Sequence, residues 1–492
     1  MGSTTPVSEA EGFVPQEEID ASCRVPVLLA FGSAAKWLVI GLLLGVVAAI
    51  KMHAPAFLAH CPWLTYGRVR PAYFDAIVYG FLSQAGIGAA LWTLARCGRG
   101  RLALPGVASA GGVVWNLGVL VGVLQVLGGQ TTGLPWMEFP RQGAAVMAGG
   151  YFLMAVSACY TLLHRRKHEL YVSQWFILAA LFLFPWILSA AYMLGVVDPV
   201  RGIMQAVVSA WYANGIQYLW LTPLGLALAY YLLPKLGGAP VYSNQGAAFG
   251  FWTLVVFGNW SGLSLLQGGP LPRWMIGVGV ASKFVLLLSG VAFAVNWELT
   301  RRSAAKTAPR QPAGPFLSFG AWMFVVALFL DAITGVTSLG HKVNLTPYAT
   351  GVTHLLLFGF VGMVLLAAVY HIVPRLIPAG WSSPGLISAH FGLSLIGTLL
   401  LAGSGILGGL SYGGKLADPG VPFLTAVQGL TPFAGMTTLG LLLLLLGGGV
   451  FGLHLLLTVV RGTARERAAF CSWCCGCGTL PGGAEKKARA GA

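Results

Sequence analysis

The sequence predicts an all-α polytopic membrane protein with about twelve transmembrane helices. Hydrophobic residues make up 57% of its 492 residues, charged residues only 9%, and the mean hydropathy is +0.77. Long runs without charge recur along the chain, and a helix of about 20 apolar residues is long enough to cross a bilayer. This composition excludes a water-soluble protein of the same length.

The expected elements follow one another with mostly short loops. Residues 1–25 are polar and acidic, so we expect no cleavable signal sequence there, only a cytoplasmic N-terminal segment. Residues 26–460 form the membrane domain, and 461–492 form a basic, cysteine-rich cytoplasmic tail. The predicted spans are 26–50, 72–95, 104–128, 142–163, 172–196, 202–233, 245–266, 274–297, 316–338, 347–373, 384–408 and 432–460.

The basic residues predict the orientation of these spans. The net charge is +15, and lysines and arginines gather in the loops after even-numbered spans, as at 96–101, 165–167 and 301–310. Loops rich in lysine and arginine stay in the cytoplasm. Both termini are therefore expected to be cytoplasmic, and the positive charge does not indicate a nucleic-acid partner.

The tail holds four closely spaced cysteines in the sequence CSWCCGC: Cys471, Cys474, Cys475 and Cys477. This spacing is compatible with zinc or an iron-sulfur cluster, but no second pair lies at the distance typical of a zinc finger. Cysteines just beyond a last span are also sites of lipidation. The third interpretation is a tail without a specific site, and the sequence does not decide among them.

Two charges lie deep within predicted spans: Lys283 in the eighth and Asp331 in the ninth. A charged side chain at the bilayer centre costs about 3 kcal/mol on insertion scales, so such residues usually pair or face a cavity. Because the two spans are consecutive, we expect a Lys283–Asp331 ion pair. It is either structural or part of a pathway for protons or ions. Asp75, at the start of the second span, is expected at the interface.

Four motifs carry a resemblance to one family. They are LTYGRVRP at 64–71, WYANG at 211–215, YYLLPK at 230–235 with PVYS following at 240–243, and YHIVPRL at 370–376. In this order the motifs resemble the catalytic subunit of the cbb-type cytochrome c oxidases, the C branch of the haem-copper oxidases. The resemblance runs from about residue 63 to 376. It implies the twelve-helix subunit I fold, the bacterial inner membrane, and partners such as a membrane-anchored cytochrome c besides the membrane lipids.

The family's chemistry uses six histidines, which bind a low-spin haem, a high-spin haem and a copper ion. The resemblance places the sixth position, a low-spin haem ligand, on His354. It places the family's cross-linked tyrosine on Gly258. The other five ligand positions fall on Tyr73, Asn214, Ser264, Leu265 and Val352. We therefore expect no copper, no high-spin haem and no catalytic residue, and the family's activity, oxygen reduction, is not expected of this chain.

His354 leaves two hypotheses open. It either ligates one b-type haem or hydrogen-bonds across helices, a contact worth about 0.6 kcal/mol or somewhat more in membranes. Arg68 and Arg70 stand where the family's arginines meet haem propionates, which guanidinium groups bind well. Without a haem they would contact lipid headgroups or loops. His371 is expected at the cytoplasmic interface, and His454 is expected to make a helix contact.

These residues support three hypotheses about function. The first is an oxidase-like membrane protein that acts as a non-catalytic subunit or partner in a respiratory complex. The second is electron transfer through a single low-spin haem on His354. The third is ion or proton passage through Lys283 and Asp331. A cytochrome c oxidase subunit I identity would rest on similarity of fold, because a fold alone does not determine activity.

Overall fold

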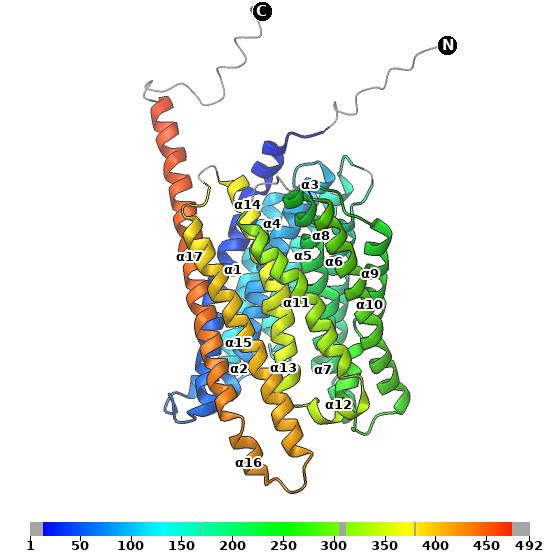
Figure 1. Cartoon of the computed structure of the whole chain (residues 1–492). Helices are drawn as coiled ribbons and strands as arrows, with labels where there is room; N and C mark the ends of the chain where they lie inside the picture. The colour runs from blue at the N-terminus through cyan, green and yellow to red at the C-terminus, as the bar shows by residue number, and fades with distance from the viewer. Residues whose placement is uncertain (1–12, 168, 305–310, 378–379, 475–492) are drawn as a thin grey trace, which may run out of the picture.

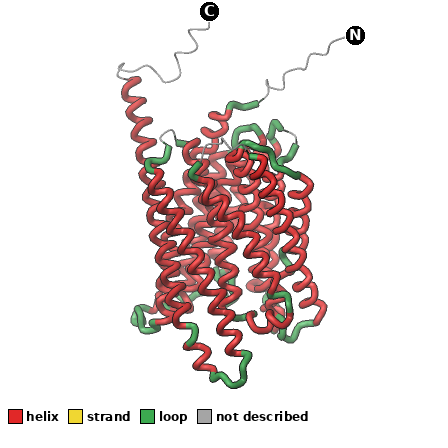
Figure 2. The backbone as a smooth tube through the Cα atoms, viewed as in Figure 1, coloured by secondary structure: helices red, strands yellow, loops and turns green. Residues whose placement is uncertain are grey.

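The computed structural model describes residues 13–167, 169–304, 311–377 and 380–474, with side chains described as far as residue 462. All regular secondary structure in this part of the chain is helical (Figure 2). The long helices run side by side in a bundle (Figure 1). This architecture confirms the predicted all-α polytopic membrane fold.

The helices alternate with short turns. Segments η3, η4, η5 and η7 are π-helical, and η2 and η6 are 3₁₀ helices. In chain order the elements are α1 (Gln16–His53), η2 (Pro62–Leu64), α2 (Tyr66–Asp75), η3 (Ala76–Leu82), α3 (Ser83–Gly98), α4 (Pro105–Leu127), α5 (Arg141–Leu163), α6 (Val172–Tyr192), η4 (Met193–Val197), α7 (Ile203–Asn214), η5 (Gly215–Leu221), α8 (Thr222–Gly237), α9 (Asn244–Phe257), η6 (Ser261–Leu266), α10 (Arg273–Ser303), α11 (Ala313–Ile333), α12 (Thr337–Val343), α13 (Pro347–His354), η7 (Leu355–Gly362), α14 (Met363–Leu376), α15 (Pro384–Leu416), α16 (Phe423–Gln428) and α17 (Thr431–Cys474).

Within the described residues, 11 helices are long and apolar enough to cross a membrane. The remaining predicted span, 245–266, is a shorter helix, α9, followed by a turn and η6. The break falls on Gly258, Asn259 and Ser261, which are poor helix formers. At the N-terminus α1 begins at Gln16, so the end of the predicted polar segment 1–25 is already helical.

Three membrane-spanning stretches form the centre of the bundle. In the most apolar windows of Tyr66–Gly98, Ile203–Gly237 and Pro347–Leu376, 94%, 100% and 100% of the residues are buried, compared with 33–56% in the other eight. Helices that are covered on all sides lie inside a bundle, whereas helices with one exposed face border the lipid. The three central stretches also carry Tyr73 and His354, the positions of the low-spin haem ligands, and Asn214.

Candidate functional site

Each central stretch changes from α-helix to π-helix close to a predicted ligand position. Tyr73 lies three residues before η3, and Asn214 and His354 directly precede η5 and η7. A π-helical turn holds one residue more than an α-helical turn, and such segments occur frequently at functional sites. The three widened turns therefore mark the interior where the family's metals would lie.

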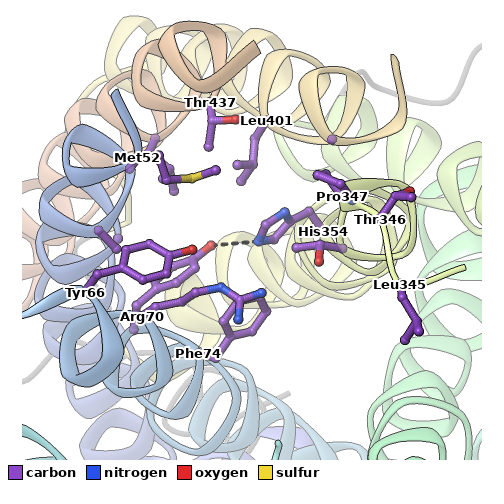
Figure 3. A pocket seen from close by; sticks show the side chains of 17 residues that line it. Met52, Tyr66, Arg70, Phe74, Leu345, Thr346, Pro347, His354, Leu401 and Thr437 are labelled. Atoms are coloured by element: carbon purple, nitrogen blue, oxygen red, sulfur yellow. Dashed lines mark hydrogen bonds between the residues drawn. The ribbon is translucent and has the colours of Figure 1, made fainter. Parts of the chain in front are cut away.

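His354 and Tyr73 contact each other directly. The Tyr73 hydroxyl lies 3.2 Å from His354 Nε2 in a buried hydrogen bond, and the Phe74 ring stacks on the imidazole at 5.3 Å. His354 and Arg70 border a cavity of about 290 Å³ between α1, α2, α13, α15 and α17 (Figure 3). Tyr73 can reach His354 because it packs on Gly45, where a Cβ atom would lie 2.8 Å from the Tyr73 ring.

This arrangement does not fit a haem held between His354 and Tyr73. His354 and Tyr73 would have to hold the group between them, and a tyrosine is not the imidazole partner that a low-spin haem would need. The Tyr73 hydroxyl and His354 Nε2 are 3.2 Å apart and joined by a hydrogen bond, so each of these atoms already has a partner. The close packing of the Tyr73 ring on Gly45 resists its withdrawal toward α1.

The two arginines of the GRVRP turn have different surroundings. Arg68 donates a hydrogen bond to the carbonyl of Leu127 at the end of α4, at 3.3 Å. Gly129, at φ +91°, leaves room for this guanidinium, since a Cβ atom there would lie 2.7 Å from it. Arg70 instead lines the His354 cavity and lies over the Phe74 ring at 5.7 Å. Arg68 thus makes a loop contact, and only Arg70 faces the cavity.

Of the four positions that the resemblance assigns to the copper and the high-spin haem, Asn214, Leu265 and Val352 line a second, small cavity of about 50 Å³, whereas Ser264 does not. The Asn214 amide donates to the carbonyl of Gly258, at 3.0 Å, and to the Ser261 hydroxyl. These contacts place the family's cross-linked tyrosine position beside the copper-ligand position. None of these side chains offers the imidazole or thiolate that a copper ion requires.

The expected Lys283–Asp331 ion pair lines this same small cavity. Lys283 Nζ lies 2.9 Å from Asp331 Oδ1 and donates to the Thr334 hydroxyl at 2.6 Å. Lys283 is 2% exposed and the Asp331 side chain 21%. A charged pair therefore lines the same cavity as three of the positions that the resemblance assigns to metal ligands. The sequence identified both charges but not their position beside Asn214 and Val352.

A carboxyl pair that the sequence analysis missed lines a third cavity, of about 390 Å³. Asp75, expected at the interface, is buried at 2% exposure, and one oxygen of Asp75 and one of Glu138 have no hydrogen-bond partner in the described part of the chain. Burial raises the pKa of Glu138 to about 7, although backbone amides and Arg70 oppose the shift. The loop before α5 leaves Glu138 half-buried with one carboxylate oxygen enclosed, and no local pattern predicts such a fold-back.

The third cavity adjoins the other two. It shares Arg70 and Phe74 with the His354 cavity, and it shares Asn214, Gln217 and Leu265 with the small cavity at the ion pair. Polar side chains of these adjoining cavities therefore extend from the loop between α4 and α5 to the Lys283–Asp331 pair.

The other histidines of the central and neighbouring helices have structural surroundings. His371 is buried among protein side chains at 4% exposure, and its carbonyl accepts a hydrogen bond from Arg375, the residue expected beside it. His390 bonds the Tyr370 hydroxyl at 2.8 Å, and His454 Nε2 accepts the Ser383 N–H at 3.3 Å, as expected for a helix contact. The cysteine cluster at 471–477 lies outside the residues whose side chains are described.

Three comparisons with known proteins all find oxidase subunits or oxidase structures that are similar to this chain. Residues 25–443 match the family of cytochrome c and quinol oxidase polypeptide I. The chain is 26% identical over 475 residues to a cytochrome c oxidase subunit 1 homolog of Azorhizobium caulinodans, covering 91% of this chain and 85% of that protein. It is 27% identical over 391 residues to a cbb3-type cytochrome c oxidase subunit of Stutzerimonas stutzeri, covering 77% and 81%. The structure of a haem-copper terminal oxidase dimer shares the fold, with a TM-score of 0.71 at 15% identity over 88% of this chain and 84% of that one.

Proposed function

The chain belongs to the cytochrome c and quinol oxidase polypeptide I family, and we propose that it acts as a non-catalytic subunit of a respiratory membrane complex. Its site in the cell is then the bacterial inner membrane. Its partners are other membrane subunits, such as a membrane-anchored cytochrome c.

One observation supports this proposal: the Lys283–Asp331 ion pair lines the same cavity as three positions where the family has metal ligands and this chain has other residues. Asn214, Leu265 and Val352 supply no imidazole, and the Lys283 ammonium group lies in the same cavity. Lys283 also holds the Asp331 carboxylate in an ion pair, so that the carboxylate lining this cavity is already engaged and is not free to bind a metal cation. The chain therefore keeps the fold of the family, but these positions offer no imidazole to bind the metals that would reduce oxygen.

The metal and haem content of the purified native complex tests the proposal. We expect no copper bound to this chain and a haem content that His354→Ala does not change, because His354 already bonds Tyr73. His390→Ala, equally buried but outside the cavity, controls for a general loss of assembly. A b-type absorption band that disappears only in His354→Ala would overturn the proposal and favour electron transfer.

Ion or proton passage is the second candidate, and the adjoining polar cavities favour it. The third cavity leads from the outer loop past Asn214 and Gln217 to the partly exposed Asp331. Intramembrane charges that face a cavity are typical of ion pathways. Flux into proteoliposomes should then fall when both Lys283 and Asp331 are replaced by leucine. An unchanged flux would remove this candidate and leave the ion pair with a structural role.

A further inference from the structure

Lys36 is a third intramembrane charge, and it faces away from the bundle. It is exposed at the middle of α1, which packs against α3, α4 and α17 on its other sides. At one end of α1, Asp20 pairs with Arg96; at the other, Lys51 donates to the Phe57 carbonyl. Lys36 lies about 24 Å and about 22 Å along the helix from Asp20 and Lys51, at 1.5 Å per residue. It is therefore near the centre of a hydrocarbon core about 30 Å thick.

The lysine cannot reach the membrane surface from this depth. Its extended side chain is about 6 Å long, by standard bond lengths, whereas half of the hydrocarbon core is about 15 Å. Its ammonium group lies 4.8 Å from the ring centroid of Trp37, a contact that does not neutralise the charge. Among the described ion pairs, none includes Lys36. The charge is thus left facing lipid, an arrangement that is costly and rare.

The surface around Lys36 is shaped for a neighbouring helix. Val25, Gly32, Lys36 and Leu43 are exposed at spacings that place them along one side of α1. Gly32, one turn before the lysine, has open space at the position of a Cβ atom. Small residues at such positions let a second transmembrane helix approach closely.

We propose that this face of α1 binds a transmembrane helix of a partner subunit that carries an aspartate or glutamate at mid-bilayer depth. The inference deepens the proposed function and rests on it for the existence of partner subunits. Charge complementarity selects this occupant, because an intramembrane carboxylate has the same need for a partner as the lysine. A second copy of this chain is a poor alternative: Asp331 is engaged by Lys283, and Asp75 is buried.

The first experiment compares partner retention among Lys36 variants of the full-length tagged chain, purified from native membranes in mild detergent. We expect Lys36→Arg to keep the partner and Lys36→Leu to lose it at least ten-fold, while the amount of chain in the membrane stays unchanged. Lys36→Leu removes a charge from the lipid face, so it is not expected to impair insertion. Equal retention in Lys36→Leu and the unaltered chain would overturn the inference.

The second experiment identifies the contact. A photo-crosslinking amino acid at Gly32 should join a transmembrane peptide that contains an acidic residue, whereas one at Phe152, exposed on α5, should not. Lys36→Glu should abolish assembly, and changing the partner's acidic residue to lysine should restore it. Crosslinks only to lipid, to a second copy, or to a segment without a carboxylate would overturn the inference.

The two proposals can fail separately. Partner subunits that co-purify but do not contact Gly32 leave the proposed function intact. Copper or haem bound by this chain, together with an intact contact at Lys36, overturns the function alone.

Discussion

At the scale of single residues, the Lys283–Asp331 ion pair joins α10 to α11 inside the membrane domain. Removing Asp331 alone would leave a nearly fully buried ammonium group without its counter-charge. Breaking a buried ion pair in this way typically costs about 3–5 kcal/mol, whereas replacing both members by apolar residues is often neutral. We therefore expect Asp331→Leu to lower the thermal unfolding temperature in detergent far more than the double variant Lys283→Leu/Asp331→Leu.

The double variant is the matched control for the single one. If both unfold at the same temperature as the unaltered chain, the pair does not stabilise the bundle. Loss of stability only in the double variant would indicate that the two residues pack as side chains rather than act as a pair.

Glu138 predicts a pH dependence of opposite sign to that of an ordinary surface carboxylate. Its pKa is about 7 in the folded chain, compared with 4.5 when unperturbed, mainly because the group is buried. The folded chain therefore binds the proton more tightly than the unfolded chain, so this contribution is complete below about pH 4.5 and is lost as the pH rises through 7. Glu138→Gln should unfold like the unaltered chain at pH 5 but be more stable at pH 8, by about 1–3 kcal/mol.

Thermal unfolding of the two proteins in the same detergent at both pH values measures this difference. A constant difference between pH 5 and pH 8 would contradict the prediction, because it would reflect packing rather than titration.

The sequence showed which charged residues lie within the membrane domain, but it did not show what surrounds each of them. Lys283 and Asp331 were recognisable because each interrupts an apolar run, and their consecutive spans made contact probable. Lys36 interrupts such a run as well, but its importance depends on which side of α1 the neighbouring helices cover. That information lies in the packing of α4 and α17 and not in the local sequence.

At the scale of elements, Asn214 connects α7 to the break between α9 and η6. Its amide donates to the carbonyl of Gly258, which α9 leaves free where it ends, and to the hydroxyl of Ser261 at the start of η6. Asn214→Leu removes both hydrogen bonds and leaves the Gly258 carbonyl with only the bond from the Ser261 hydroxyl, at 3.4 Å. A lost buried hydrogen bond typically costs about 1 kcal/mol. We expect faster hydrogen exchange in residues 258–266 and little change in α4 or α5.

Asn116→Leu offers a comparison, since this asparagine also bonds a carbonyl within the membrane, that of Gly112. It should not alter exchange in residues 258–266. An Asn214→Leu variant with unchanged exchange there would mean that Gly258 and Ser261 hold the break without the amide.

Most span positions could be predicted because apolar runs and their polar ends coincide with helices. The start of α1 was set too late, since its first turns are polar and pair with arginines near the end of α3. The break after α9 was missed because its residues, apart from Asn259, are as apolar or small as a continuous span requires. The Asn214 amide on α7, 44 residues away, bonds the Gly258 carbonyl at this break, and the local sequence does not show that contact.

At the scale of the whole molecule, the start of α1 and the end of α17 lie at the same end of the bundle, and α12 and α16 lie at the other (Figure 1). The first end carries the basic loops around Arg99 and Lys167, so the positive-inside rule places it in the cytoplasm. A reporter inserted after Glu169 should therefore remain cytoplasmic, and one inserted at Gly420, in the exposed turn between α15 and α16, should be outside.

Alkaline phosphatase and green fluorescent protein, inserted separately at both positions, measure this orientation because they are active on opposite sides of the bacterial inner membrane. We expect phosphatase activity only at Gly420 and fluorescence only at Glu169. The reverse pattern would place both termini outside. It would also turn the third cavity, which Glu138 lines, toward the cytoplasm, so that any proton reaching Asp331 would enter from the opposite side. The orientation thus decides from which compartment the third cavity can be reached.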